Sequence, residues 1–289
     1  MHYILIADSG STKTDWMACL SSDPLNSSRL FQTQGINPYH QNDDAILTIL
    51  QQELLPGLMS AGLWPSGLKT IRFYGSGVRP EQEQRMRRLL LDAMPEANDV
   101  LVKSDMLGAA HALCGDREGI VCILGTGANS CLYDGRQIVQ NTPPLGYVLG
   151  DEGSGAVLGI RFLNALYKNR LYQNAQAEFE DAFKLSMGDV ISHVYRQPMA
   201  NRWLASLSTY IHQHLSQPTV RALVVDNFRL FVRYNLEPYG RHDLPVSAVG
   251  SIAYFYLEQF REALQEEDYR MGTVFRSPIE GLQHYWCKE

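Results

Sequence analysis

Apolar segments alternate with amphipathic segments along the whole chain, and their spacing predicts alternating strands and helices. In the first third, five apolar runs of strand length are separated by two stretches with apolar residues at helical spacing. The predicted strands are 2–7, 16–20, 29–33, 71–74 and 100–102, and the predicted helices are 43–59 and 81–93. Three strands followed by alternating helices and strands are typical of an α/β fold.

The same order begins again near Gly119. A strand at 120–124 leads through the turn GTGAN into a strand at 130–133, and Asp134-Gly135 predicts a type I′ hairpin that leads to a third strand at 137–140. In both places an apolar strand enters a turn of small, hydroxylated residues and leaves as another strand, first as IADSGSTKTDW and then as ILGTGANSCLY. This repeat predicts two related lobes that face each other, 1–115 and 116–289.

The rest of the second lobe is mostly helical in pattern. Helical spacing occurs at 156–167, 175–184, 202–214 and 219–234, and a strand at 245–249 is followed by a helix from Ile252. The last helix, at about 278–289, can pack back on the N-terminal lobe. A chain of 289 residues lies at the upper limit for one hydrophobic core, which agrees with two lobes.

Composition and charge narrow the function classes. The net charge of −6 and the pI near 5.8 give no basic surface, so we expect no nucleic-acid partner. No apolar run approaches the roughly 18 residues that cross a bilayer, and the start MHYILIADSG enters a strand without a signal segment. We therefore expect no membrane partner and a cytoplasmic location. The five cysteines include no C-x-x-C pair, which argues against a zinc site or a disulfide framework.

Small and hydroxylated residues follow the first strand, in the segment Asp8-Ser-Gly-Ser-Thr-Lys-Thr14. Small residues let backbone N–H groups approach phosphate oxygens, the hydroxyls add donors, and Asp8 can hold hydrated magnesium. The same residues also suit a tight hairpin with an aspartate at the turn. The second turn, Gly125-Thr-Gly-Ala-Asn129, repeats the pattern and favours phosphate binding.

Three further segments carry candidate chemistry. Asp105 closes a strand and opens the helix MLGAAHAL, where it can act as a general base or, like Ser104, cap the helix. Asp151, in the loop GYVLGDEGSG, can point at a ligand hydroxyl or cap the next helix. Gly250 and Ser251 follow a strand, where small residues allow either an adenine ring or a close helix–strand contact.

Five segments are similar to those of the N-acetylglucosamine kinase branch of the acetate and sugar kinase, Hsp70 and actin superfamily. In chain order they are DSGSTKT, SDMLGAAHA, ILGTGANS, GYVLGDEGSGAVLG and AVGSIA, spread over nearly the whole chain. The same branch includes the BadF/BadG activator ATPases. LGDEGSG after GTG-x-N is the specific signature, because the phosphate turns are shared across the superfamily.

The resemblance implies two RNase-H-like lobes of the actin-like ATPase fold, with ATP, Mg²⁺ and a sugar in the cleft between them. It also implies transfer of the γ-phosphoryl group of ATP to the 6-hydroxyl of an amino sugar, N-acetylglucosamine above all, and a homodimer is common among relatives. Asp105 matches the catalytic base. The residues that match the nucleotide-binding motifs are Asp8, Ser9, Gly10, Ser11, Thr12, Lys13, Gly125, Thr126, Gly127, Gly250 and Ser251. Those that match the sugar pocket are Asn37, Ser76, Gly77, Asn129 and Asp151.

Two positions depart from the family pattern. Leu145 stands where some relatives have a tryptophan, which removes a platform for the sugar or its acetamido group. The first phosphate motif reads S-G-S where relatives commonly have G-G-G, and serine keeps the volume small while adding a donor. The alternative function is an activator-type ATPase or a sugar-sensing switch that acts on a protein partner.

Overall fold

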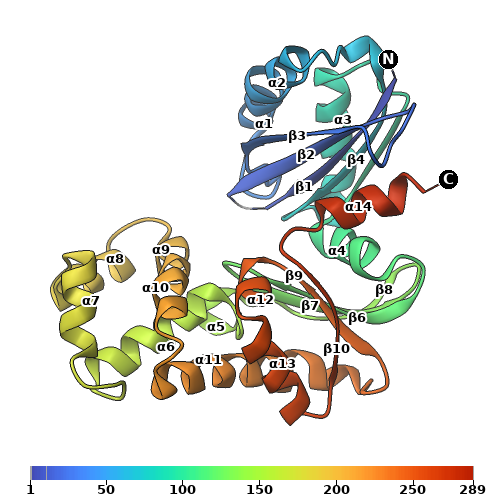
Figure 1. Ribbon diagram of the computed structural model, residues 1–289. Helices are drawn as coiled ribbons and strands as arrows, with labels where there is room; N and C mark the ends of the chain where they lie inside the picture. Colours follow the sequence, from blue (N-terminus) through green and yellow to red (C-terminus); the bar gives the residue numbers. More distant parts are fainter. Residues whose placement is uncertain (1, 11, 289) are drawn as a thin grey trace. The chain divides into compact units, whose positions relative to one another are not determined.

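The computed structural model describes residues 2–10 and 12–288. The chain divides into two compact units (Figure 1). Unit 1 consists of Met1–Asp116 together with Ser277–Glu289, and unit 2 consists of Arg117–Arg276. Unit 2 is therefore one continuous segment, whereas unit 1 takes its last helix from the end of the chain.

Unit 1 is built on a mixed sheet, whose described strands have the order β3-β2-β1-β4-β5. The strands are β1 (Tyr3–Ser9), β2 (Lys13–Leu20), β3 (Ser28–Gln34), β4 (Leu68–Gly75) and β5 (Asp99–Ser104). The first three are antiparallel to one another, and β4 and β5 continue the sheet parallel to β1. All five lie where the apolar pattern predicts strands.

The sheet of unit 1 is covered by helices on both faces. The helices are α1 (Asp43–Ile49), α2 (Leu55–Ser60), α3 (Pro80–Ala93), α4 (Asp105–Cys114) and α14 (Ile279–Trp286), with a π-helical turn at Leu50–Leu54 and a 3₁₀ turn at Pro65–Gly67. Side chains of a strand alternate between faces, so Leu5 packs in one core with α1–α3 while Ile6 packs in another with Leu282 of α14. Burial on both faces explains why the strands read as nearly continuous apolar runs.

Unit 2 repeats this sheet. Its described strands have the order β10-β9-β6-β7-β8, with β6, β7 and β8 antiparallel and β9 and β10 parallel to β6. The strands are β6 (Glu118–Leu124), β7 (Ala128–Asp134), β8 (Ile138–Thr142), β9 (Pro245–Val249) and β10 (Arg270–Phe275). The predicted α/β fold with two related lobes is confirmed, and the similarity of the two turns extends to the whole strand order.

The helices of unit 2 pack into one large apolar core with β6 and β9. They are α5 (Gly146–Leu149), α6 (Gly155–Tyr167), α7 (Ala175–Phe183), α8 (Met187–Tyr195), α9 (Ala200–Ser206), α10 (Ser208–Gln213), α11 (Pro218–Phe231), α12 (Ser251–Phe255) and α13 (Leu257–Glu266). A π-helical turn, Val232–Leu236, and a 3₁₀ turn, Glu237–Tyr239, follow α11. No helix in the described part of the chain is both long and apolar enough to cross a membrane.

The hairpin between β7 and β8 differs from the predicted type I′ turn. The N–H of Asp134 donates to the carbonyl of Gln137 over 3.2 Å, so the central residues are Gly135 and Arg136. A type I′ turn needs positive φ at both central residues, but of these two only Gly135 has it, at 92°. The Asp134 carboxylate instead accepts the N–H groups of Arg136 and Gln137, each over 2.8 Å.

Candidate active site

The carboxyl ends of three parallel strands meet at one edge of the sheet in unit 1. Ser9, the last residue of β1, pairs with Gly75 of β4, and Gly75 pairs with Ser104 of β5. The segments that follow these strands, namely the first phosphate turn, the loop at 76–78 and the N-terminus of α4, therefore lie at the same edge. Ligands of open α/β sheets bind at such strand ends.

Two carboxylates gather at this edge. Burial, and next the negative charges of Asp105 and Asp15, raise the pKa of Asp8 to about 7, while Lys13 acts in the opposite direction. Burial also raises the pKa of Asp105, although the N–H of Met106 donates to its Oδ1 over 2.8 Å and partly offsets this. A cation bound at this edge would favour the ionised form of both carboxylates.

The helix cap and the candidate base are different residues. Ser104 occupies the N-cap of α4, and its Oγ accepts the N–H of Leu107 over 3.3 Å. Asp105 is the first residue of the helix. Of the two roles open to Asp105 from the sequence, the cap is thus filled by its neighbour.

The described residues of the first phosphate turn differ in their contacts. The N–H of Gly10 donates to the carbonyl of Lys13 over 3.0 Å and closes the turn, and Thr12 is exposed. The Nζ of Lys13 lies 2.8 Å from Asp15 Oδ2, and this ion pair fixes the position of the lysine ammonium group. Ser11 lies outside the described residues, so its expected role stays a prediction.

Ser9 serves the fold through its side chain. Its buried hydroxyl lies 2.6 Å from Thr14 Oγ1 and 2.9 Å from the carbonyl oxygen of Ile36, and it accepts the N–H of Ile36 over 3.0 Å. These contacts tie the turn to the segment that leads to Asn37. Ser9 was expected to bind nucleotide; its hydroxyl has partners inside unit 1, and nucleotide binding by this turn stays a prediction.

The sugar-pocket residues expected from unit 1 lie together. Gly77 has φ of 75°, and a Cβ there would collide with Oδ1 of Asn37. The N–H of Ser76 donates to the carbonyl of Ser9 over 2.8 Å, which places this loop beside the first phosphate turn. Glycine at 77 is thus required both by the backbone conformation and by the close approach of the asparagine amide.

The second phosphate turn is held by the start of α6 in unit 2. The N–H of Gly125 donates to the carbonyl of Gly127 over 3.0 Å. The carbonyls of Gly125 and Thr126 accept the N–H groups of Gly155, over 2.8 Å, and Ala156, over 3.1 Å. The first turn of α6 thereby fixes the loop that carries the GTG motif.

Asp151 lies against this second turn. Its φ is 56°, a conformation that few non-glycine residues adopt. Its carboxylate accepts the N–H groups of Ala128 and Gly146, and burial raises its pKa. A Cβ at Gly127 would lie 2.9 Å from Asp151 Oδ2, so the glycine makes room for the carboxylate. Ser154 caps α6, so the capping role considered for Asp151 is filled elsewhere.

The remaining expected residues of unit 2 have clear positions. Asn129 Oδ1 accepts the N–H of Ser130 and the Nδ2 of Asn141, each over 2.9 Å. Gly250 has φ of 121°, and a Cβ there would collide with the carbonyl of Leu124, which directly precedes the second turn. The close helix–strand contact is therefore present at Gly250, while contact with adenosine at Gly250 and at the exposed Ser251 stays a prediction.

Asp15 was not predicted to belong to the candidate site. It lies directly opposite Asp8 across the antiparallel pair β1–β2, and its Oδ1 accepts the Nε2 of Gln32 over 2.8 Å as well as the Nζ of Lys13 over 3.0 Å. The signal was available, because a turn between two antiparallel strands places residues at equal distances from it opposite each other. Asp15 orients the lysine of the phosphate turn and adds to the charge felt by Asp8.

Comparison with known proteins was made at the level of family models, curated sequences and solved structures. No family model matches the chain. A candidate N-acetylglucosamine kinase of Porphyromonas gingivalis, of known structure, is 44% identical, with a TM-score of 0.92 over 98% of both chains. The chain belongs to the N-acetylglucosamine kinase family.

Two further relatives of this family member are more distant. The N-acetylmuramic acid/N-acetylglucosamine kinase of Clostridium acetobutylicum is 26% identical over 224 residues, which span 73% of this chain and 70% of that one. A candidate N-acetylglucosamine kinase of Chromobacterium violaceum is 19% identical over 99% of both chains with a TM-score of 0.73, so it shares the fold.

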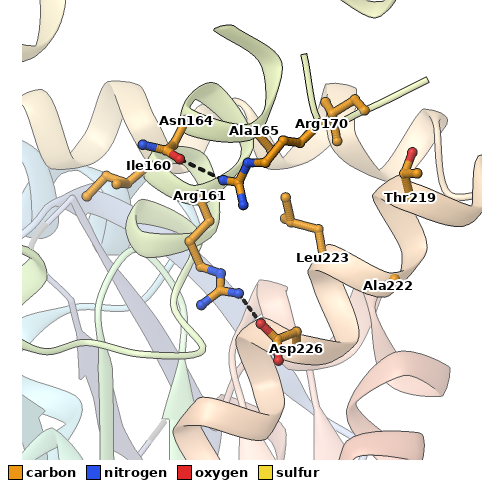
Figure 2. A pocket seen from close by; sticks show the side chains of 10 residues that line it. Ile160, Arg161, Asn164, Ala165, Arg170, Thr219, Ala222, Leu223 and Asp226 are labelled. Carbon is orange, nitrogen blue, oxygen red and sulfur yellow. Dashed lines mark hydrogen bonds and ion pairs between the residues drawn. The ribbon is translucent and has the colours of Figure 1, made fainter. Parts of the chain in front are cut away.

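This chain has a surface pocket in unit 2, between α6 and α11 (Figure 2). Its volume is about 560 Å³. Arg161 of α6 pairs with Asp226 of α11, and Nη2 of Arg170 donates to Asn164 Oδ1 over 2.7 Å (Figure 2). None of the expected site residues lines this pocket, and both guanidinium groups already contact acceptors in the protein. The strand ends therefore remain the candidate active site.

Proposed function

We propose that this protein is an ATP-dependent kinase that transfers the γ-phosphoryl group of ATP to the 6-hydroxyl of an amino sugar, with N-acetylglucosamine as the first candidate. Family membership makes the chain a sugar kinase. To this the proposal adds which amino sugar is the substrate and which of its hydroxyl groups accepts the phosphoryl group. The observation that carries the proposal is the register of β1, β4 and β5, which brings Asp8, Ser76 and Asp105 to one edge of a sheet.

Asp105 is the proposed general base. It accepts the proton of the sugar 6-hydroxyl while the hydroxyl oxygen forms a bond to the γ-phosphorus, and the bond from that phosphorus to the bridging oxygen breaks to release ADP. Burial raises the pKa of Asp105, so its carboxylate is a stronger base than an exposed one. Phosphoryl transfer needs mainly positioning and charge neutralisation, and the named residues supply both.

Asp8 is the proposed magnesium ligand. Its surroundings fit a cation, because burial and the charges of Asp105 and Asp15 raise its pKa to about 7 in the absence of one. When bound, Mg²⁺ supplies positive charge to the phosphates of ATP. Across residues 2–10 and 12–288 there is no group of three or more His, Cys, Asp or Glu side chains placed to hold a metal. Magnesium in nucleotide sites needs only one or two carboxylates, with phosphates and water as the other ligands.

The proposed sugar ligands are hydroxyl-binding groups. In unit 1 these are the amide of Asn37 and the loop at Ser76 and Gly77, and in unit 2 they are Asn129 and the Asp151 carboxylate. A carboxylate that accepts a sugar hydroxyl makes a stronger hydrogen bond than a neutral acceptor does. The proposal includes a cytoplasmic location, where ATP is available, and a homodimer, which static light scattering measures directly.

The test is a kinase assay with purified protein, ATP and a panel of sugars. The panel contains N-acetylglucosamine, N-acetylmuramate, glucosamine and glucose, with 6-deoxy-N-acetylglucosamine as the matched control that lacks the acceptor hydroxyl. We expect a 6-phosphate of one amino sugar, identified by phosphorus NMR, and no product from the control. ATP consumption that is independent of sugar and gives no sugar phosphate would overturn the kinase proposal and favour the activator-type ATPase.

A further inference from the structure

Three aromatic side chains on different elements of unit 1 form a chain of hydrogen bonds. The Nε1 of Trp286, on α14, donates to the hydroxyl of Tyr74, on β4, over 2.9 Å. The same hydroxyl lies 2.8 Å from Nδ1 of His111, on α4. Tyr74 is fully buried and His111 is buried, so each of these polar atoms depends on partners within the protein.

One hydrogen bond of the chain has a fixed direction. An indole N–H can only donate, so the Tyr74 oxygen accepts from Trp286, whereas the tautomer of His111 decides which partner donates in the second bond. Burial lowers the pKa of His111 to about 4, so the imidazole is neutral at neutral pH and Nδ1 can accept. Hydrogen bonds thus connect α14, β4 and α4 through the Tyr74 hydroxyl.

Close packing fixes α4 at the same place. A Cβ at Gly108 of α4 would lie 2.8 Å from Cβ of Tyr74, and a Cβ at Gly281 of α14 would lie 2.5 Å from the carbonyl oxygen of Ala112. The His111 ring stacks on Tyr285 of α14 with 4.2 Å between centroids. Helix α4 therefore packs closely against both β4 and α14, and these contacts restrict its sliding.

Two members of this hydrogen-bonded chain, His111 and Tyr74, belong to elements that lead to the candidate active site. His111 is six residues after Asp105 on the same helix, about 9 Å along its axis. Tyr74 directly precedes the segment Gly75-Ser76-Gly77, which carries the sugar-binding loop. A shift of α4 against β4 would therefore change the distance between the base and the sugar.

We infer that Trp286, Tyr74 and His111 are positioning residues, which set α4 against β4 so that Asp105 meets the acceptor hydroxyl. The inference rests on the proposed kinase function. A misplacement of about 1 Å in an active site can reduce the rate roughly 10²-fold. Loss of the chain is expected to lower kcat and to leave ATP binding intact, because the hydrogen bonds of Trp286 and His111 described above lead to Tyr74 and not to the nucleotide-binding motifs.

Tyr74→Phe is the decisive variant, because it keeps the ring that packs on Gly108 and removes only the hydroxyl. The matched control is Tyr3→Phe, since the Tyr3 hydroxyl lies in the same sheet, is buried and has no hydrogen-bond partner. We expect Tyr74→Phe to lower kcat at least about tenfold, with KM for ATP within about twofold of the parent. Tyr3→Phe should keep the parent kcat. Both are assayed well below their melting temperatures.

The outcomes are distinct. A parent protein that makes no sugar phosphate contradicts the proposed function, whereas an active parent with an equally active Tyr74→Phe overturns the positioning role. A rise in KM for ATP equal to the fall in kcat would show a general structural loss and would also overturn it. If Tyr74→Phe does not fold, Trp286→Phe removes the N–H donor while keeping a ring under Arg72, and the same fall in kcat is expected.

Discussion

Asp105 and Ser104 separate catalysis from helix capping at the scale of single residues. Asp105→Asn keeps the shape of the side chain and removes the base, so we expect kcat to fall by roughly 10²–10⁴-fold with an unchanged melting temperature. Ser104→Ala should lower the free energy of unfolding by about 1 kcal/mol, because the helix cap is lost. It should leave kcat unchanged, because the Asp105 carboxylate remains. Initial rates and thermal melts of both variants test this. An Asp105→Asn rate within about threefold of the parent would refute the base, and Asp151 would be examined next.

The two glycines of the second turn should affect different ligands. A Cβ at Gly127 would lie 2.9 Å from Asp151 Oδ2, whereas a Cβ at Gly125 would have nothing within 4 Å. Gly127→Ala is therefore expected to displace the Asp151 carboxylate and to raise KM for the sugar roughly tenfold, the worth of one hydrogen bond to a charged group. Gly125→Ala should act on KM for ATP, because its methyl group would occupy the space that the proposed phosphate contact needs. Steady-state kinetics with ATP and with the sugar as the varied substrate test this prediction. If each variant changed the two KM values equally, the separate roles of Gly125 and Gly127 would be contradicted.

The roles of single side chains were harder to predict than the place where they gather. Asp8, Ser76 and Asp105 follow predicted strands, and parallel pairing of β1, β4 and β5 brings those strand ends together. Which hydroxyl or carboxylate faces a ligand depends on contacts from distant segments. Ser9, for example, is occupied by Ile36, 27 residues away along the chain. Local sequence contains no sign of such a contact.

At the scale of elements, most strands and long helices follow from the apolar pattern, and the exceptions have physical causes. The predicted helix at 202–214 is divided at Leu207, whose buried side chain packs in the core between α9 and α10. Strand β10 was not predicted because Gly272 interrupts its pattern, and the structure shows that a Cβ there would collide with Ser247. Helix α8 was also missed, although Ser186 and Asp189 form a capping box that marks its start.

Docking of α14 on α4 should depend on pH through His111. Burial lowers its folded pKa from 6.5 to about 4, with Asp116 acting in the opposite direction. The unfolded chain takes up this proton as the pH falls below about 6.5 and the folded chain does not, so unit 1 loses stability between pH 6.5 and 4. The full shift corresponds to about 3 kcal/mol.

His111→Gln serves as the comparison for that pH dependence, because glutamine can accept a hydrogen bond and does not titrate in this range. Urea unfolding at intervals across pH 7 to 4 should show a smaller loss of stability in the variant than in the parent. Parallel curves for the two proteins would show that the proton binds elsewhere. Tyr74, Tyr285 and Trp286 also face His111, but they do not change charge in this interval.

At the scale of the whole molecule, the two units differ in how they depend on chain continuity. Unit 2 is one segment with its own apolar core, so a fragment of residues 117–276 should unfold cooperatively by itself. A fragment of residues 1–116 lacks α14 and would expose Ile6, Met17 and Tyr74. We expect it to bind a hydrophobic dye and to melt without cooperativity. Joining 277–289 to its end should restore a cooperative transition, and a compact, cooperative 1–116 fragment would contradict this.

The placement of α14 in unit 1 also has a consequence during synthesis. The ribosome makes β1 to α4 before unit 2, but it makes α14, which covers Ile6 and Met17, only after unit 2. Unit 2 can complete its core while that face of the first sheet is still uncovered. Domains usually fold in the order in which they are made, and uncovered apolar faces invite aggregation. Synthesis of unit 1 begins before unit 2 and is completed after it, so chaperones that recognise nascent chains have the longer opportunity to bind at the sheet of unit 1.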